Sequence, residues 1–151
     1  MAELKERLRA DLNAAMRARD QVRMRTLRMA LTSITNEEVA GTAARDLTDD
    51  EIVKVLTREA RKRREAAEAF SAAGRDEQAA AERAEGEVLA GYLPAQLSDD
   101  ELAALVAAAI SETGASGLPG MGQVMKTVTP RVAGRADGAR VAAEVRRRLS
   151  G

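Results

Sequence analysis

The segment TDDEIVKVLTREA, residues 48–60, carries the strongest fold signal in the chain. Thr48 is a good N-cap residue, and Glu51 three positions later completes a capping box, in which each side chain accepts a hydrogen bond from the other residue's backbone N–H. Apolar residues then recur at the spacing that places them on one face of a helix. They are Ile52, Leu56, Ala60, Ala67 and Phe70. The pattern predicts a helix that runs from this box to Gly74.

The opposite face of the same helix is basic and carries Lys54, Arg58, Arg61 and Lys62. Two interpretations fit it: a contact with RNA phosphates, and a solvated surface whose charge is trimmed by Glu65 and Glu68. We favour the second, because charge runs are common on solvated helices and no aromatic residue is interleaved for base stacking. Arg63 falls on the apolar side, four residues after Glu59, where a local ion pair with that glutamate is expected.

Two further helices are expected before Gly41. The first has an apolar stripe at four-residue spacing, made of Leu4, Leu8, Leu12 and Met16. Asp20 is placed to cap the second, whose apolar seam is suited to antiparallel packing on the first. The seam consists of Met24, Leu27, Leu31 and Ile34. Another helix carries Ala81, Ala84, Val88 and Tyr92 and stops at Pro94, because the residue before a proline is steered away from helix.

A second capping box, Ser98-Asp99-Asp100-Glu101, opens the remainder of the chain. Its helix continues through Leu102, Leu105, Val106 and Ile110 and ends near Gly114. Two more helices are expected, one over residues 121–132 and one from an Asp137 cap through Val141, Val145 and Leu149. The predicted fold is all-α: an amino-terminal antiparallel helical subdomain, residues 1–95, followed by a small three-helix carboxy-terminal bundle, residues 96–151.

Composition favours helices and excludes most catalytic chemistry. The chain is 45% hydrophobic but only 1% aromatic, and its alanine, leucine, valine and methionine suit closely packed helices. It contains neither cysteine nor histidine, which excludes disulfides, thiolate metal sites and every arrangement of a nucleophile with an imidazole base. The paired carboxylates stand at helix starts, where capping accounts for them. We expect no catalytic residue, no cofactor and no metal.

Charge and hydropathy bear on location and partners. Lysine and arginine number 24, aspartate and glutamate also 24, so the formal net charge is zero and no overall field directs the protein to nucleic acid. The start, Met1-Ala2-Glu3-Leu4-Lys5-Glu6, is charged, and no run reaches the roughly 18 apolar residues that a membrane span needs. We therefore expect a cytoplasmic protein with no membrane partner.

The most asymmetric region is the tail from residue 115 onward, where seven basic residues face two acidic ones, a net charge of +5. Both a nucleic-acid contact and arginines that favour the dipole of the last helix explain it. The loop Gly117-Leu118-Pro119-Gly120-Met121-Gly122 precedes a helix but lacks the strand and the GKS or GKT ending of a phosphate-binding loop. We interpret it as a loop that requires positive φ.

Three short motifs carry a family resemblance: Tyr92-Leu93-Pro94-Ala95-Gln96-Leu97-Ser98, Gly120-Met121-Gly122-Gln123-Val124-Met125-Lys126 and Gly134-Arg135-Ala136-Asp137-Gly138. On these residues, and on the arginine-rich helix that precedes Phe70, Gly74 and Arg75, the chain resembles the YqeY-like proteins of the GatB/YqeY family from end to end. It departs from the common motif at Gly120, where an acid is frequent, and at Gln123, where a lysine is frequent.

The resemblance implies a carboxy-terminal unit similar to the tail domain of the tRNA-dependent amidotransferase B subunit, which contacts tRNA. The residues that it marks for RNA contact are Gln123, Lys126, Arg131, Arg135 and Arg140, to which we add Arg147, seven residues after Arg140 on the same side of the last helix. The family label, carbon–nitrogen ligase with glutamine as amido-N-donor, comes by association, because the kinase-like body of the B subunit and the glycine- and serine-rich amidase signature of its partner are missing.

The sequence is thus interpreted as a noncatalytic tRNA-binding or amidotransferase-associated accessory module. The resemblance implies tRNA as its partner, together with amidotransferase or tRNA synthetase components. The alternative is a helical protein–protein adaptor without RNA binding, whose apolar faces, such as the seam from Met24 to Ile34, bind another protein or a second copy of the chain.

Overall fold

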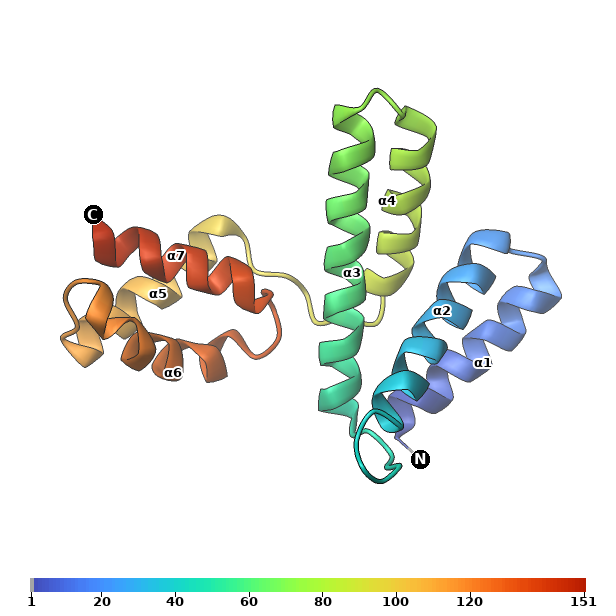
Figure 1. Ribbon diagram of the computed structural model, residues 1–151, viewed down its shortest axis with the longest axis horizontal. Helices are drawn as coiled ribbons and strands as arrows, with labels where there is room; N and C mark the ends of the chain where they lie inside the picture. Colours follow the sequence, from blue (N-terminus) through green and yellow to red (C-terminus); the bar gives the residue numbers. More distant parts are fainter. Residues whose placement is uncertain (1) are drawn as a thin grey trace. The chain divides into compact units, whose positions relative to one another are not determined.

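The computed structural model describes residues 2–151, and over that range the chain forms seven α-helices, one short 3-10 helix and no strand (Figure 1). The predicted all-α class is confirmed. The helices gather into two compact units, Met1–Leu93 and Pro94–Gly151. Each unit has a hydrophobic core of its own.

The first unit consists of two helical hairpins, which Figure 1 shows in blue and green. α1 (Glu3–Ala18) packs on α2 (Gln21–Glu38), and α3 (Asp49–Ala72) packs along α4 (Asp76–Ala90). The fully buried core side chains are those of Leu8, Leu27, Ile34, Ile52, Leu56 and Leu89, with Ala30 and Ala79. Leu27 and Ile34 belong to the predicted seam, so the seam packs inside its own unit and its most buried side chains are not available to another protein.

The capping box that begins α3 forms as predicted. The Thr48 hydroxyl accepts a hydrogen bond from the Glu51 backbone N–H at 3.2 Å, and a Glu51 carboxylate oxygen accepts one from the Thr48 N–H, also at 3.2 Å. The Arg45 guanidinium adds two hydrogen bonds to the same carboxylate, at 3.0 and 2.6 Å. These contacts, that of Arg45 first, lower the pKa of Glu51 to about 2, so the cap keeps its charge far into the acid range.

Two predicted apolar stripes each fail at one residue. In α1 the stripe fails at its end, where Met16 is exposed and Ala15 is buried instead. In α4 Ala81 is exposed and Ala79 and Leu89 are buried, but the predicted Val88 packs against the core, as does Tyr92 just after the helix. The face of α4 that meets α3 is the one that carries two glutamates, and their carboxylates lie 3.7 and 3.4 Å from the guanidinium of Arg63.

A buried ion pair that the sequence did not reveal fastens α1 to α2. The Lys5 ammonium lies 2.7 Å from one carboxylate oxygen of Glu38 and 3.0 Å from the other, and both side chains are about nine-tenths buried. Glu38 also accepts a hydrogen bond from the backbone N–H of Leu47 at 3.3 Å. The hydrogen bond from Lys5 is the main reason that the pKa of Glu38 is lowered. This carboxylate therefore joins α1, α2 and the segment that leads into α3.

Tyr92, just after α4, connects the end of that helix to α1. Its ring is buried and lies 4.6 Å from the Arg7 guanidinium, a cation–π contact. Its hydroxyl donates a hydrogen bond of 2.6 Å to the Asp11 carboxylate. Burial, and then this hydrogen bond, raise the pKa of Tyr92 to about 12.

The second unit contains α5 (Asp99–Thr113), the 3-10 helix η1 (Leu118–Gly120), α6 (Met121–Val132) and α7 (Gly138–Ser150). The three α-helices each pack on the other two. Their core includes Leu102, Val106, Ala109, Val124, Val128, Val141 and Val145. The second capping box forms as predicted, since Ser98 and Glu101 exchange hydrogen bonds of 3.0 and 3.1 Å. The Asp137 cap is confirmed too, by a hydrogen bond of 2.9 Å from the Arg140 N–H.

The loop before α6 supports its interpretation as a turn that needs glycine. Gly117 has a φ of 72°, in the region that favours glycine. At Gly120 the constraint is space, because an added Cβ would lie 2.7 Å from the Cβ of Ala115. A larger residue at position 120 would therefore require Ala115 to shift.

Among residues 2–151, no single helix is long and apolar enough to cross a membrane. One bent pair, Asp99–Thr113 with Leu118–Val132, passes the test by length and composition. The apolar side chains of this pair include the buried Leu102, Val106, Val124 and Val128, which form the core of the second unit.

The Tyr92 environment predicts an unusual titration. Tyr92 is the only tyrosine in the chain, so ultraviolet absorbance of phenolate reports on it alone, and we expect a midpoint near pH 12. In Asp11→Asn the midpoint should fall but stay above the ordinary value of about 10, because burial is the larger cause. The raised pKa means that the stabilising contribution of the neutral phenol is complete below about pH 10 and is lost as the pH rises through 12. A midpoint near 10 in the unaltered protein would contradict this account.

The separate cores predict that residues 94–151 fold alone. Val106, Val124, Val128 and Val145 are fully buried by side chains of their own unit, so the fragment should give a helical circular dichroism spectrum and a cooperative melting transition. Val128→Asp in the same fragment, which buries an unpaired charge, should abolish the transition. A random-coil spectrum of the unaltered fragment would show that the second unit depends on the first.

Candidate functional site

The six predicted RNA-contact residues lie on α6, on α7 and on the segment between them. Gln123 and Lys126 are exposed on α6, whose buried side carries Val124 and Val128. Neither side chain has a hydrogen-bond or ion-pair partner within residues 2–151. Both are therefore free to contact a ligand.

Arg131, at the end of α6, is bound to the carboxylate of Glu112 near the end of α5. The hydrogen bond between them raises the pKa of Arg131 and lowers that of Glu112. Both side chains remain substantially exposed. Arg131 therefore meets solvent as half of an ion pair and not as an isolated cation.

Arg135 and Arg140 lie together at the start of α5. Arg135 donates a hydrogen bond of 3.0 Å from Nε to the backbone oxygen of Ala95, and its guanidinium lies 3.9 Å from Glu101. Arg140 binds Asp99 at 2.8 Å. The two acids belong to the capping segment of α5, so residues that begin this helix also neutralise arginines that come from later in the chain.

The last turns of α7 hold three consecutive arginines around one acid. Arg147 donates hydrogen bonds of 3.1 and 2.7 Å to Glu144, and Arg148 donates one of 3.0 Å to the same carboxylate. The hydrogen bond from Arg147 is the main cause of the lowered pKa of Glu144. The Arg146 side chain is exposed and has no partner among the described residues. This cluster has an excess of positive charge even after pairing.

The predicted contacts do not form one patch. Asp99 and Glu112, which bind Arg140 and Arg131, are 13 residues apart on α5, a distance of about 20 Å along the helix axis. The whole second unit has seven basic and six acidic side chains, a net charge of +1. The excess counted over the tail is thus largely offset by the acids of α5, which the fold places beside it.

The basic face of α3 is partly neutralised in the same way. Arg58 lies 3.4 Å from Glu37, Arg61 lies 3.9 Å from Glu65, and Lys62 lies 3.3 Å from Glu59. Lys54 is exposed and has no partner within residues 2–151. These contacts fit the solvated-surface interpretation of this face.

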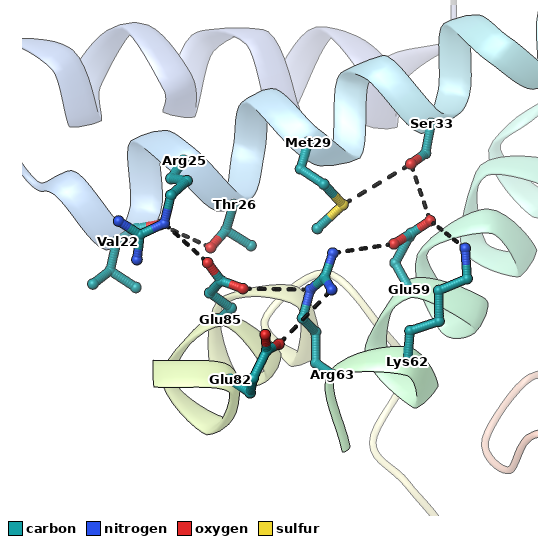
Figure 2. Close-up of polar contacts among 10 residues, drawn as sticks. All are labelled: Val22, Arg25, Thr26, Met29, Ser33, Glu59, Lys62, Arg63, Glu82 and Glu85. Atoms are coloured by element: carbon teal, nitrogen blue, oxygen red, sulfur yellow. Dashed lines mark hydrogen bonds and ion pairs between the residues drawn. The ribbon is translucent and has the colours of Figure 1, made fainter. Parts of the chain in front are cut away.

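Arg63 lies at the centre of a polar cluster that joins α2, α3 and α4 (Figure 2). Its predicted ion pair with Glu59 is confirmed, at 3.4 Å. The sequence did not indicate two further carboxylates, Glu82 at 3.7 Å and Glu85 at 3.4 Å, because both come from α4. Glu59 also accepts a hydrogen bond from Ser33 of α2, and Glu85 accepts one from Arg25, each at 3.0 Å. With Lys62 bound to Glu59, three basic and three acidic side chains balance one another, so this cluster holds helices together.

One group of cations escaped the sequence analysis. Residues 17–28 contain Arg17, Arg19, Arg23, Arg25 and Arg28 but only one acid, Asp20. Counting charges over residues 17–28 would have revealed these arginines, because this segment is as asymmetric in charge as the carboxy-terminal tail. Of the five, Arg25 alone has an ion-pair partner among the described residues, Glu85.

Residues 2–151 therefore define an all-α protein of two helical units, in which no group of acidic side chains is arranged to hold a metal ion. A family model described as Yqey-like protein matches residues 5–149. This chain belongs to the YqeY-like family. No match was found among curated proteins.

The Arg63 cluster predicts a large decrease in stability when its central cation is removed. The Arg63 side chain is only 20% exposed, so Arg63→Met leaves three largely buried carboxylates without their shared partner and should lower the free energy of unfolding by about 3 kcal/mol. Arg61→Met, two positions earlier on α3, removes a more exposed pair and should change stability far less. Urea unfolding of both variants checks this, and equal effects would contradict it.

Proposed function

We propose that this chain is a noncatalytic accessory module that binds tRNA through its carboxy-terminal unit, in the cytoplasm and in company with amidotransferase or tRNA synthetase components. The observation that carries the proposal is the free state of Gln123 and Lys126. Both lie in the segment from Gly120 to Lys126, which bears the family resemblance, and both are exposed without a partner among the described residues. No internal contact accounts for the polarity of these two side chains.

The charges on α7 support the same proposal. Arg146 is free, and Arg147 and Arg148 share a single carboxylate, so the end of this helix keeps positive charge for phosphate contacts. The other candidates, Arg131, Arg135 and Arg140, are held by exposed acids. Exposed ion pairs contribute little to stability, so a phosphate can replace the carboxylate when RNA binds.

The noncatalytic part of the proposal is supported by the composition and by the contacts of the acids. The chain has no cysteine or histidine. A catalytic acid or base would therefore have to be a carboxylate. The carboxylates of Glu51, Glu101 and Glu144 cap helices or bind arginines, and these contacts lower their pKa values. A carboxylate with a lowered pKa is a poor general base at neutral pH.

The proposal predicts a specific effect on tRNA binding. Lys126→Gln with Arg146→Gln removes two cations that have no internal partner, so tRNA affinity should fall. The log–log salt slope should flatten by up to about 0.9 for each duplex phosphate that is no longer contacted. The matched control, Arg58→Gln with Arg61→Gln, removes the same charge from α3 and should leave binding nearly unchanged. Filter binding or fluorescence anisotropy over a salt series measures both.

Two results would contradict the proposal. One is the absence of tRNA binding by the unaltered protein at low salt, and the other is equal binding by the Lys126 and Arg146 variant. Release of ammonia from glutamine by the purified chain, if it survived repurification, would overturn the noncatalytic part alone.

A further inference from the structure

The turn between α1 and α2 carries a dense group of cations on the first unit. Arg17 lies in the last turn of α1, Arg19 is its C-cap, and Arg23 and Arg28 lie on α2. We call these four residues the hairpin arginines. None of them has an ion-pair partner within residues 2–151. Figure 1 shows that this turn lies at an outer edge of the unit, away from the turn that joins α3 to α4.

The groups around the hairpin arginines do not neutralise them. Asp20 accepts a hydrogen bond of 3.1 Å from the Arg23 backbone N–H and serves as the cap of α2. The Arg28 guanidinium is held only by the thioether sulfur of Met16, at 3.4 Å. Glu85 of α4, which reaches this stretch of α2, is bound to Arg25. Within residues 17–28, apart from the paired Arg25, four guanidinium groups stand against the one carboxylate of Asp20, a net charge of +3 for this segment. The nearest further acid in the sequence, Asp11, accepts a hydrogen bond from Tyr92.

Arg19 occupies a backbone position that favours glycine. α1 ends in a Schellman motif, in which the Arg19 N–H binds the Met16 oxygen and the Asp20 N–H binds the Ala15 oxygen. Arg19 has a φ of 56° there. α3 ends in the same motif, with hydrogen bonds to Ser71 and Phe70, and places Gly74 at the equivalent position, with a φ of 74°. An arginine at this position is strained, and within residues 2–151 its side chain makes no hydrogen bond or ion pair that would offset the strain.

We propose that the hairpin arginines bind the phosphate backbone of RNA, a second contact surface that rests on the proposed function in taking RNA as the polyanion. Guanidinium groups match phosphate oxygens with two parallel hydrogen bonds. The one exposed large apolar side chain at the turn, Met16, is too little for the apolar centre of a protein interface. Tyr92 lies near enough to Arg23 for that charge to influence its hydroxyl, but its ring is buried, and Phe70 lies on α3. The contact is therefore with phosphates and not by base stacking.

The test uses the full chain and total tRNA. Replacing all four hairpin arginines by glutamine should weaken binding on the order of tenfold and flatten the salt slope by roughly 3 units. The matched control changes Lys54, Arg58, Arg61 and Lys62 to glutamine, which removes the same charge from the same unit, and should bind nearly as the unaltered protein does. Arg23 is half-buried. If circular dichroism shows that the quadruple variant does not fold, the binding test uses a triple variant that keeps Arg23.

The possible outcomes separate this surface from the proposed function. If the unaltered protein binds no tRNA, both fail. If the hairpin variant binds as well as the unaltered protein or as its control, while the Lys126 and Arg146 variant binds less, the hairpin surface alone fails. In a competition experiment, polyglutamate of matched charge should displace labelled tRNA less effectively than unlabelled tRNA does. Equal displacement would assign the surface to an acidic protein and overturn the RNA contact.

A single substitution gives an independent check. Arg19→Gly relieves the positive φ and should raise the melting temperature by about 3 °C, while it lowers tRNA affinity. The matched control is Ala133→Gly, at the C-cap of α6, where φ is 51°. It should be stabilising without any effect on tRNA binding. Unchanged affinity in Arg19→Gly would show that the residue does not contact RNA.

Discussion

The guanidinium of Arg63 is the point on which the first unit depends, because three helices meet at it. It lies within 3.7 Å of carboxylates from both α3 and α4, and Glu59 extends the contact to Ser33 of α2. The core of this unit consists mainly of leucine and isoleucine side chains, and Arg63 lies where α3 and α4 approach each other. Charged side chains that are buried between two packed helices must be paired, since an isolated buried charge is very costly. The cluster therefore links α3 to α4 directly, and to α2 through Glu59.

The same rule of pairing governs the surface of the second unit. The acids that begin α5 act twice: as part of the first turn they favour the helix dipole, and as ion-pair partners they hold Arg135 and Arg140. A charge count along the tail cannot include these acids, because Asp99 precedes Arg140 by 41 residues. Positive charge survives where the fold brings no acid, as at Lys126, at Arg146 and at the hairpin arginines.

The features that the sequence predicted correctly are those determined within one or two helical turns. Both capping boxes, the Asp20 and Asp137 caps and the pair of Arg63 with Glu59 involve residues three or four apart. Contacts over long separations were missed, such as Lys5 with Glu38 and Arg63 with Glu82. The predicted face of α4 was wrong at Ala81, because alanines fit either side of a helix, whereas Val88 packs against the core as predicted.

The contrast between Arg19 and Gly74 bears on function as well as on stability. Both residues end a helix in the same motif with a positive φ, so the backbone alone would favour glycine at each. At residue 74 the sequence follows that preference. At residue 19 it does not, and the arginine stands among three other cations that have no ion-pair partner within residues 2–151. A locally unfavourable residue in a cluster of mutually repelling charges is not explained by the folding of this unit, because both features oppose it. The RNA contact proposed for the hairpin arginines would account for both features, because a polyanion offsets the repulsion among neighbouring cations.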